Sequence, residues 1–549
     1  MPVAGRPRSV GARSSYGEEE RGRPGRHGRK ECTPRGLRGR ESLRATQTVH
    51  ANPEALVARC VSGKKTSPPI RFDGVARLVV EMAKSYLPYN LEQRLLLPPD
   101  MREWLPEGHL ARFLLDVVAE LDLSAIERVY DAKDPRGRAG YHPAMMVALL
   151  LWAYCVGKPS SRRIERATYE DVAFRVLTGN QHPDHDSIAD FRKQHLTALA
   201  GLFMQVLRLC QKAGLVKLGH IAIDGSKFKA NASKHKAMSY GRMSEAEKKL
   251  EAEIQALLEE AARVDSEEDA QHGKGKRGDE LPEELRRRES RLQKIREAKA
   301  ELEREAKERA EAKAAEVAEK LAERARHEAE TGKKARGAEP KAPDPEEAKP
   351  EPKAQRNFTD PESRIMPDGA NKGAFVQGYN AQIAVDAEAQ VIVAVLVTQS
   401  TNDKRQLVPM AEAITANVGQ SAEITSADTG YFSEQNVEHP ALAATNLLVP
   451  PERQKHGTAT NAEAIGDSDS AAQRMRIKLS SPEGRAHYKR RKAIVEPVFG
   501  QIKEARGIRR LLLRGLEAAS AEFSIIALTH NVLKLFRARG ALAGLPRAA

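Results

Sequence analysis

The sequence has few cysteines, few aromatic residues and no long hydrophobic run. Its four cysteines, Cys32, Cys60, Cys155 and Cys210, lie far apart without a CxxC pair, which excludes a cysteine zinc module and argues against a disulfide framework. We therefore expect a protein of the reducing cytoplasm. The longest apolar run, residues 144–156, has 13 residues, whereas a membrane-spanning helix needs roughly 20. The polar, arginine-rich start predicts no secretory leader.

The composition is unevenly distributed for a chain of 549 residues. Aromatic residues make up 5% and charged residues 30%, so the hydrophobic core must be concentrated in parts of the chain. Lys and Arg number 90 against 76 Asp and Glu, a net charge of +14. An excess of this size favours a polyanionic partner such as nucleic acid.

Residues 1–68 are predicted to be a disordered extension. The first 50 residues hold 11 Arg and 8 Gly with almost no apolar periodicity, too little apolar surface to offset the chain entropy. Two interpretations stay open: a basic nucleic-acid-binding arm, or a non-native extension with Met82 as the true first residue. We favour the second.

Residues 85–215 are predicted to form a helical domain. Apolar residues from Trp104 to Val117 fall at helical spacing, and Pro143 suits the first turn of a second helix. Another helix follows, with Ser160 or Ser161 as its candidate N-cap, and carries Arg162 and Arg163. Short helices with exposed arginines suit helix-turn-helix-like DNA binding, and an ordinary helical bundle with solvated arginines fits equally well.

The segment 220–228 begins with a predicted short strand that ends at Asp224-Gly225. A long insertion follows this segment. Residues 241–356 form a charged insertion, in which 281–330 predicts a long helix with many ion pairs and 338–353 a stiff proline-rich linker. The role of the insertion is open, and a tolerated surface excursion is our preferred interpretation. Strand character returns as a hairpin over 378–397 and a strand running to Asp428. Residues 452–484 suggest a loop, and the last 65 residues helix.

Three acids are the candidates for chemistry. Asp224 and Asp428 are each followed within two residues by Gly, and Glu496 lies in a segment, 485–514, with 10 Lys or Arg and 2 acids. Clustered carboxylates repel unless a cation lies between them, and hard divalent cations take carboxylate and phosphate oxygens. Alternatives stay open for each: a helix N-cap, an Asx-turn acceptor and a surface ion pair, respectively.

Other polar residues have simpler interpretations. Asp386 is predicted to lie in the hairpin turn and Asp403 to cap a helix. His182 and His185, with Asp186, are predicted to be exposed polar residues rather than metal ligands, because Pro183 interrupts them.

Four motifs together resemble bacterial insertion-sequence transposases of the DDE, RNase H-like class with a helical InsH-type N-terminal domain. They are Ile223–Lys227 with Lys229–Ser233, Gln377–Gln382, Ala427–Tyr431, and Tyr488 with Glu496 and Lys503. The resemblance covers about residues 85–240 and 357–540. It implies an α+β fold with an RNase H-like mixed sheet, formed by 218–240 and 357–540, after an all-helical DNA-binding domain.

The resemblance also implies a mechanism. Asp224, Asp428 and Glu496 would bind two Mg²⁺ ions, with Mn²⁺ as the alternative, to cut and join DNA by phosphoryl transfer. Contacts to DNA are then expected from Tyr488, Arg491, Lys492, Lys503, Arg162 and Arg163. The partners would be terminal inverted repeats and target DNA, bound by a homodimer near the nucleoid. In the family pattern three residues separate Arg from Glu, whereas four separate Arg491 from Glu496 here. A catalytically silent DNA-binding derivative and a two-metal nuclease without strand transfer are the alternatives.

Overall fold

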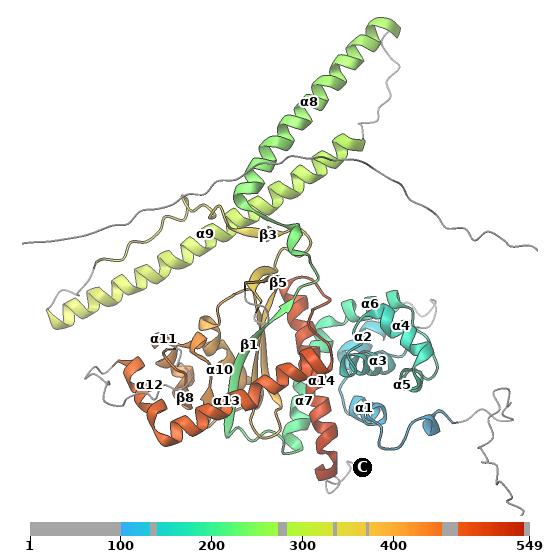
Figure 1. The fold of residues 1–549 in the computed structure, drawn as a ribbon, viewed down its shortest axis with the longest axis vertical. Coiled ribbons are helices and arrows are strands. Elements are labelled where there is room, and N and C mark those ends of the chain that lie inside the picture. The colour runs from blue at the N-terminus through green and yellow to red at the C-terminus, as the bar shows by residue number, and fades with distance from the viewer. Residues whose placement is uncertain are drawn as a thin grey trace, which may run out of the picture. The chain divides into compact units, whose positions relative to one another are not determined.

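The computed structural model describes residues 100–131, 140–272, 283–332, 338–368, 373–452 and 470–542 (Figure 1). The predicted extension over residues 1–68, and Met82, lie outside the described residues. Within these ranges, no helix is both long enough and apolar enough to cross a membrane.

The first part of the described chain is entirely helical. Helix α3 starts with Pro143 at its first turn, as predicted, and is buried on all sides from Met146 to Cys155. Ser160 occupies the N-cap position of α4, although its side chain makes no capping hydrogen bond. The elements are η2 (Met101–Trp104), α1 (Leu110–Ala119), α2 (Ser124–Asp131), α3 (Pro143–Cys155), α4 (Ser161–Glu170), α5 (Val172–Leu177), α6 (His185–Gln194) and α7 (Leu196–Lys212).

A six-stranded mixed sheet follows, which confirms the predicted α+β class. Its order is β4-β5-β1-β7-β8, and β6 pairs with β5 as well. β1 is antiparallel to β5 and parallel to β7, and β8 is parallel to β7. The predicted hairpin is present as β5 and β6. The strands are β1 (His220–Lys229), β4 (Arg364–Pro367), β5 (Phe375–Asp386), β6 (Ile392–Thr398), β7 (Ile424–Ser426) and β8 (Asn446–Leu448).

Helices α10 (Leu407–Val418), α13 (Pro482–Gly500) and α14 (Leu516–Leu542) pack against the sheet. A π-helical segment, η8 (Gln501–Ala505), continues α13 beyond Gly500. Helix α14 contacts β5 and β6 and also α3 and α7, so it connects the sheet to the N-terminal helices. The shorter elements are η3 (Lys234–Lys236), η4 (Lys404–Gln406), η5 (Thr429–Tyr431), α11 (Glu434–Val437), η6 (Pro440–Leu442) and α12 (Ala471–Ser480).

Two local predictions were wrong. β1 does not end at Asp224-Gly225, because its pairing with β5 continues to Lys229. The loop predicted over residues 452–484 contains helix α12, whose N-cap Ser470 accepts a hydrogen bond from Gln473 N.

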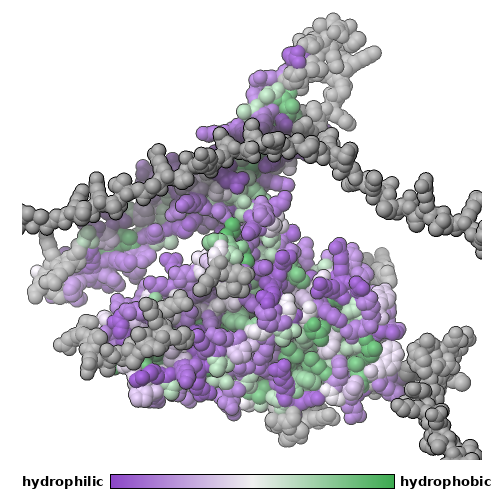
Figure 2. Space-filling view, viewed as in Figure 1, coloured by the Kyte–Doolittle hydropathy of each residue, from purple (hydrophilic) through white to green (hydrophobic). Residues whose placement is uncertain are grey.

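The charged insertion forms two long helices, α8 (Tyr240–His272) and α9 (Glu283–Thr331), which pack together, and the predicted long helix is therefore present. A small apolar cluster lies between them, with Met243 and Leu250 facing Leu292, Ile295 and Leu302. Strands β2 (Ala237–Ser239) and β3 (Gln355–Asn357) pair at the base of the insertion. Where α9 is coloured in Figure 2, hydrophilic residues predominate on its visible face.

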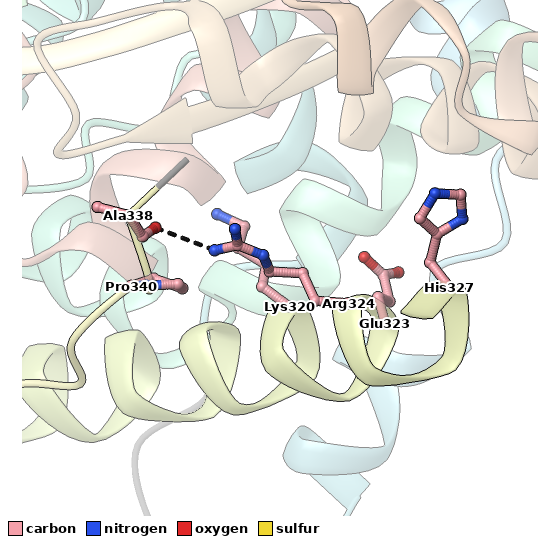
Figure 3. A pocket seen from close by; sticks show the side chains of 6 residues that line it. All are labelled: Lys320, Glu323, Arg324, His327, Ala338 and Pro340. Carbon is pink, nitrogen blue, oxygen red and sulfur yellow. Dashed lines mark hydrogen bonds between the residues drawn. The ribbon is translucent and has the colours of Figure 1, made fainter. Parts of the chain in front are cut away.

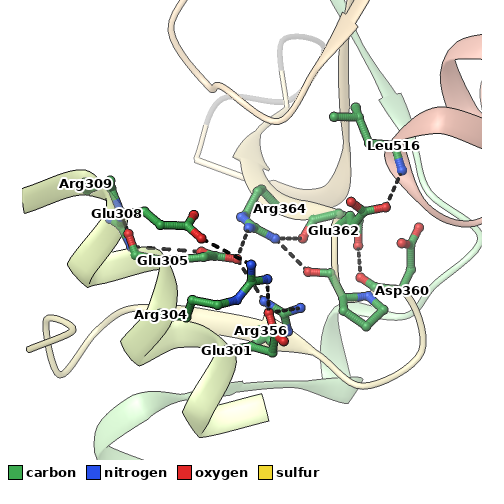
Figure 4. Close-up of polar contacts among 12 residues, drawn as sticks. Glu301, Arg304, Glu305, Glu308, Arg309, Arg356, Asp360, Glu362, Arg364 and Leu516 are labelled. Atoms are coloured by element: carbon green, nitrogen blue, oxygen red, sulfur yellow. Dashed lines mark hydrogen bonds and ion pairs between the residues drawn. The ribbon is translucent and has the colours of Figure 1, made fainter. Parts of the chain in front are cut away.

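Ion pairs attach α9 to the segment that returns to the sheet (Figure 4). Glu305 Oε1 accepts hydrogen bonds from Arg356 on β3 at 2.8 Å and from Arg364 on β4 at 2.9 Å. Because both arginine side chains are less than a quarter exposed, this fork is less screened by solvent than an exposed ion pair such as Arg304 with Glu308.

Candidate active site

The register of two parallel strands brings Asp224 and Asp428 together. The last pair between β1 and β7 is Ala222 with Ser426, and each aspartate lies two residues beyond it on its own chain. Since side chains alternate along a strand, Asp224 points to the same face as Ala222. Beyond this pair β7 ends while β1 continues with β5 alone, so the sheet opens at the two aspartates.

Asp224 is a largely buried carboxyl group with one cationic partner. Its side chain is 21% exposed, and its Oδ2 accepts a hydrogen bond from Arg491 Nη1 at 3.0 Å. Burial raises the pKa of Asp224 to about 6; Arg491 opposes this rise and the nearby Asp428 adds to it. The N-cap alternative for Asp224 is excluded by its place within β1. Asp224 and Asp428 together therefore carry more negative charge than the single positive charge of Arg491 can neutralise.

Asp428 begins the turn η5. Its Oδ1 accepts a hydrogen bond from Gly430 N at 2.8 Å, so the Asx-turn role suggested by the sequence is present. That bond uses one carboxylate oxygen. Burial raises the pKa of Tyr431 well above its usual value, and the negative charges of Asp403, Asp224 and Asp428 add to this rise.

Two cationic side chains lie on the same face of β1 as Asp224. Arg491 is 7% exposed, and its Nε is buried without a hydrogen-bond partner among the described residues. Lys503 Nζ donates to Ser226 Oγ at 2.6 Å and to the Lys227 carbonyl at 2.8 Å. Burial lowers the pKa of Lys503 to about 8. Arg491 and Lys503 therefore place two positive charges on this face of β1, at Asp224 and at Ser226.

The structure does not bring Glu496 to the pair. Its side chain is exposed, and it makes no hydrogen bond or ion pair within the described part of the chain. A helix turns by about 100° per residue, so a residue four positions after Arg491 shares its face. That residue is Val495, which is fully buried. The additional residue in the spacing therefore turns Glu496 away from Asp224.

The other predicted DNA contacts differ in exposure. Lys492, Arg162 and Arg163 are exposed, on α13 and α4. Tyr488 is half-buried with the Arg491 guanidinium 5.9 Å from its ring centre. Arg491 and Lys503 are engaged with β1 instead of facing solvent. As DNA contacts, all six residues stay predictions.

Sequence reasoning missed a polar network behind the aspartates. Asp403 holds the N-cap position of η4, but its side chain makes no capping bond, so the predicted capping role is wrong. Its Oδ1 accepts hydrogen bonds from Asn380 Nδ2 at 2.6 Å and Gln382 Nε2 at 2.7 Å. The sequence did hold a signal for this network. Asn380 and Gln382 alternate with apolar residues in one strand, and both are fully buried in the structure, where a side-chain amide needs hydrogen-bond partners. Asp386, by contrast, is a turn acceptor as predicted, bonded to the backbone N of Leu218 and Glu388.

The predicted non-ligand histidines are engaged elsewhere. His185 Nδ1 lies 2.8 Å from Glu165 Oε2, and the His182 ring stacks on Tyr169. Both are partly exposed rather than fully solvated.

Asp224 and Asp428 fit a divalent cation as two hard oxygen ligands whose mutual repulsion it would relieve. A complete ligand set is not assembled: in the described ranges no group of three or more His, Cys, Asp or Glu residues is arranged to hold a metal ion. The donor set therefore fits a site whose remaining ligands come from a substrate phosphate, from water or from a moved side chain.

A hollow of about 460 Å³ lies on the insertion, and its lining includes neither aspartate (Figure 3). Arg324 on α9 donates to the Ala338 carbonyl across it at 3.0 Å. Its lining is charged and open, formed by Lys320, Glu323, Arg324, His327, Ala338 and Pro340.

Comparison with known protein families is consistent with this geometry. Residues 344–532 match the family described as the transposase DDE domain, and residues 99–194 match the transposase domain DUF772. The first match includes Asp428 and Glu496 and begins after Asp224, which the insertion separates from the rest of the sheet. No curated protein and no solved structure gives a significant match. Both matches are to transposase domains, and together they indicate an insertion-sequence DDE transposase, a metal-dependent enzyme of DNA cleavage and transfer whose DDE domain is RNase H-like.

Proposed function

We propose that this transposase cuts and joins DNA at insertion-sequence ends with Asp224 and Asp428 as its catalytic carboxylates and Mg²⁺ as its ion. The observation that carries the proposal is the β1–β7 register, which sets the two acids side by side where the sheet opens. Bound divalent cations supply an activated hydroxyl nucleophile and neutralise the developing charge on the leaving oxygen.

The residues of this chain would perform three tasks. Asp224 and Asp428 bind the cation and orient the attacked phosphate against it. Arg491 limits the repulsion between them, being 3.0 Å from Asp224. Lys503, held on β1 by Ser226, adds positive charge beside the DNA backbone.

Glu496 is the proposed third acid, and its exposed position requires a change at the end of α13 before it joins the pair. Pro497 inside α13 and the π-helical η8 after it mark a place where the regular helix is already interrupted. Glu496→Gln, measured beside Asp224→Asn and Asp428→Asn, tests this assignment. Loss of cleavage in the two aspartate variants alone would remove Glu496 from the site.

We further propose the division of labour along the chain. Residues 85–215 would bind terminal inverted repeats through the InsH-type domain, with Arg162 and Arg163 on its exposed α4. Residues 218–240 and 357–540 would form the catalytic domain, and 241–356 a surface insertion. A homodimer on DNA, acting near the nucleoid in the cytoplasm, would pair the two ends.

The deciding experiment incubates the full chain with a labelled DNA fragment that carries its own flanking terminal sequence, with and without Mg²⁺. Nicking at the repeat boundary followed by joined products is the expected result. Nicking without joining would instead assign a nuclease. Specific binding without cleavage would assign a silent DNA-binding derivative.

A further inference from the structure

The polar network behind the acids is centred on Gln382, on the far face of the sheet. Gln382 pairs with Gly225 across β1 and β5, so its side chain leaves the sheet on the face opposite to Asp224. Its Nε2 donates to Asp403 Oδ1, and its Oε1 accepts a hydrogen bond from the Tyr431 hydroxyl. Every polar atom of this fully buried amide side chain is therefore engaged with a residue from another element.

The bond to Tyr431 has to cross a strand. In the sheet order β5-β1-β7, Gln382 lies on one side of β1 and the Asp428 turn follows the strand on the other side. Gly225 is the residue of β1 over which the Gln382 side chain passes to reach Tyr431. A methyl group on Gly225 would overlap Gln382 Nε2 and come within 2.9 Å of Asp403 Oδ1. The glycine after Asp224 thus leaves the space through which β5 holds the Asp428 turn.

Asp403 fixes the orientation of this crossing amide. Its Oδ1 receives hydrogen bonds from both Asn380 and Gln382, and Lys227 Nζ lies 3.5 Å away. Asn380 also donates to the Ser400 carbonyl, while its own Oδ1 is buried without a partner among the described residues. Because a carboxylate oxygen can only accept hydrogen bonds, the amides of Asn380 and Gln382 present their NH₂ groups to Asp403. Gln382 is then left with its oxygen toward Tyr431.

We propose that Gln382, Asp403 and Tyr431 are positioning residues that set the separation of the Asp224 and Asp428 carboxylates from behind the sheet. This inference rests on the proposed function, since it concerns the carboxylate pair assigned there. Within the described residues, none of these three side chains hydrogen-bonds to the carboxylate of Asp224 or Asp428, so the network would act through the geometry of the pair. Its removal should weaken cation binding without weakening DNA binding.

The test compares two buried tyrosines that each lose one hydroxyl. Tyr431→Phe breaks the bond to Gln382. Tyr379→Phe is the matched control, because its hydroxyl bonds to Asp360 at 2.8 Å, outside the network, and both tyrosines are fully buried. Mn²⁺ affinity of the full chain is measured by electron paramagnetic resonance, and DNA affinity in chelator by fluorescence anisotropy.

Tyr431→Phe should weaken Mn²⁺ binding by about 10-fold, as expected when a group that orients a metal ligand is lost, and leave DNA affinity unchanged. Tyr379→Phe should leave Mn²⁺ affinity unchanged. Asp403→Asn should also weaken Mn²⁺ binding. Because the Asp403 side chain is 23% exposed, this variant tests the network even if Tyr431→Phe does not fold.

Equal Mn²⁺ affinity in the two tyrosine variants, with wild-type protein that binds Mn²⁺ and cleaves DNA, would overturn the positioning role alone. Wild-type protein that neither binds Mn²⁺ nor cleaves DNA in Mg²⁺ would overturn the proposed function, and the inference with it.

Discussion

Neighbouring cations on α13 have different surroundings at the scale of single residues. Arg491 is nearly buried against Asp224, whereas the next residue, Lys492, is exposed. Truncating a buried charge leaves its partner uncompensated, whereas truncating an exposed one removes a screened charge. Substitution of Arg491 should therefore change mainly the free energy of unfolding, and substitution of Lys492 mainly the affinity for DNA.

Arg491→Ala should lower the free energy of unfolding by about 3 kcal/mol, because Asp224 then lies buried beside Asp428 without its counter-charge. Lys492→Ala should change it by less than about 0.5 kcal/mol. In DNA titrations, Lys492→Ala should reduce the slope of log K against log salt by about 1. Urea denaturation and salt titration of both variants measure this, and equal stabilities would contradict the contrast.

His530 on α14 supplies a pH-dependent contribution to stability. Burial lowers the pKa of His530 to about 3, aided by Arg506, and its Nε2 lies 2.9 Å from the Gln390 carbonyl. The folded chain thus binds fewer protons than the unfolded chain between about pH 3 and the usual value of 6.5, so stability falls as the pH drops below 6.5. From pH 6.5 to 5 we expect a loss of about 2 kcal/mol from this group.

His530→Gln has no group that titrates in this range, so its stability should depend less on pH than that of the wild type. Chemical denaturation of both proteins at pH 5 and pH 7 provides the comparison. A difference between the two proteins that does not change with pH would contradict the assignment.

At the scale of elements, the paired strands β1 and β5 carry the site. Their backbones approach so closely at Gly378 that only glycine fits there. A methyl group on Gly378 would overlap the Phe228 carbonyl oxygen on β1. Gly201 on α7, in contrast, has open space around it.

Gly378→Ala should lower the free energy of unfolding by about 2 kcal/mol, because the strands must move apart to admit the methyl group. Gly201→Ala should raise it by about 0.5–1 kcal/mol, since alanine favours an exposed helical position. Denaturation curves of the two variants measure both changes, and a Gly378→Ala variant as stable as the wild type would show that the sheet relaxes without cost.

Much of the element order could be predicted from the sequence, and the failures have physical causes. Alternating apolar residues revealed β5 and β6, and the charged period revealed α9. The continuation of β1 past Asp224 was missed because Ser226 and Lys227 resemble a loop, whereas pairing with β5 makes them strand. Asp224 and Asp428 were identified as candidates, but the partner of Arg491 depends on which face of α13 meets β1. Local spacing around Glu496 does not encode that choice.

At the scale of the whole described molecule, α14 couples the N-terminal helices to the sheet. Glu522 on α14 is fully buried and accepts hydrogen bonds from the Tyr154 hydroxyl at 2.9 Å and from the backbone N of Leu512 at 2.7 Å and Leu513 at 2.9 Å. Burial raises the pKa of Glu522. We expect the helices and the sheet to unfold as one cooperative unit.

The two tryptophans of the chain, Trp104 and Trp152, both lie in the helical part, so their fluorescence reports on it alone. In urea, the fluorescence transition should coincide with that of far-ultraviolet circular dichroism. Glu522→Gln should shift both transitions together to lower urea, because a neutral amide keeps one acceptor oxygen where the carboxyl group had two, while Glu517→Gln, on an exposed side chain, should shift neither. Fluorescence that changes before circular dichroism would show independent units.

The alignment of β1 with β7 by three residue pairs has a consequence for inheritance. A mobile element persists as many genomic copies, and each copy accumulates mutations of its own. Loss of the Ala427 codon, which separates Ser426 from Asp428, would shift the second carboxylate by one residue relative to the β1–β7 pairs. We expect such a copy to fold and to bind the proposed DNA ends without cutting them, so that it would compete with intact copies. The distance in codons from Ser426 to Asp428 thus separates functional copies from silent competitors.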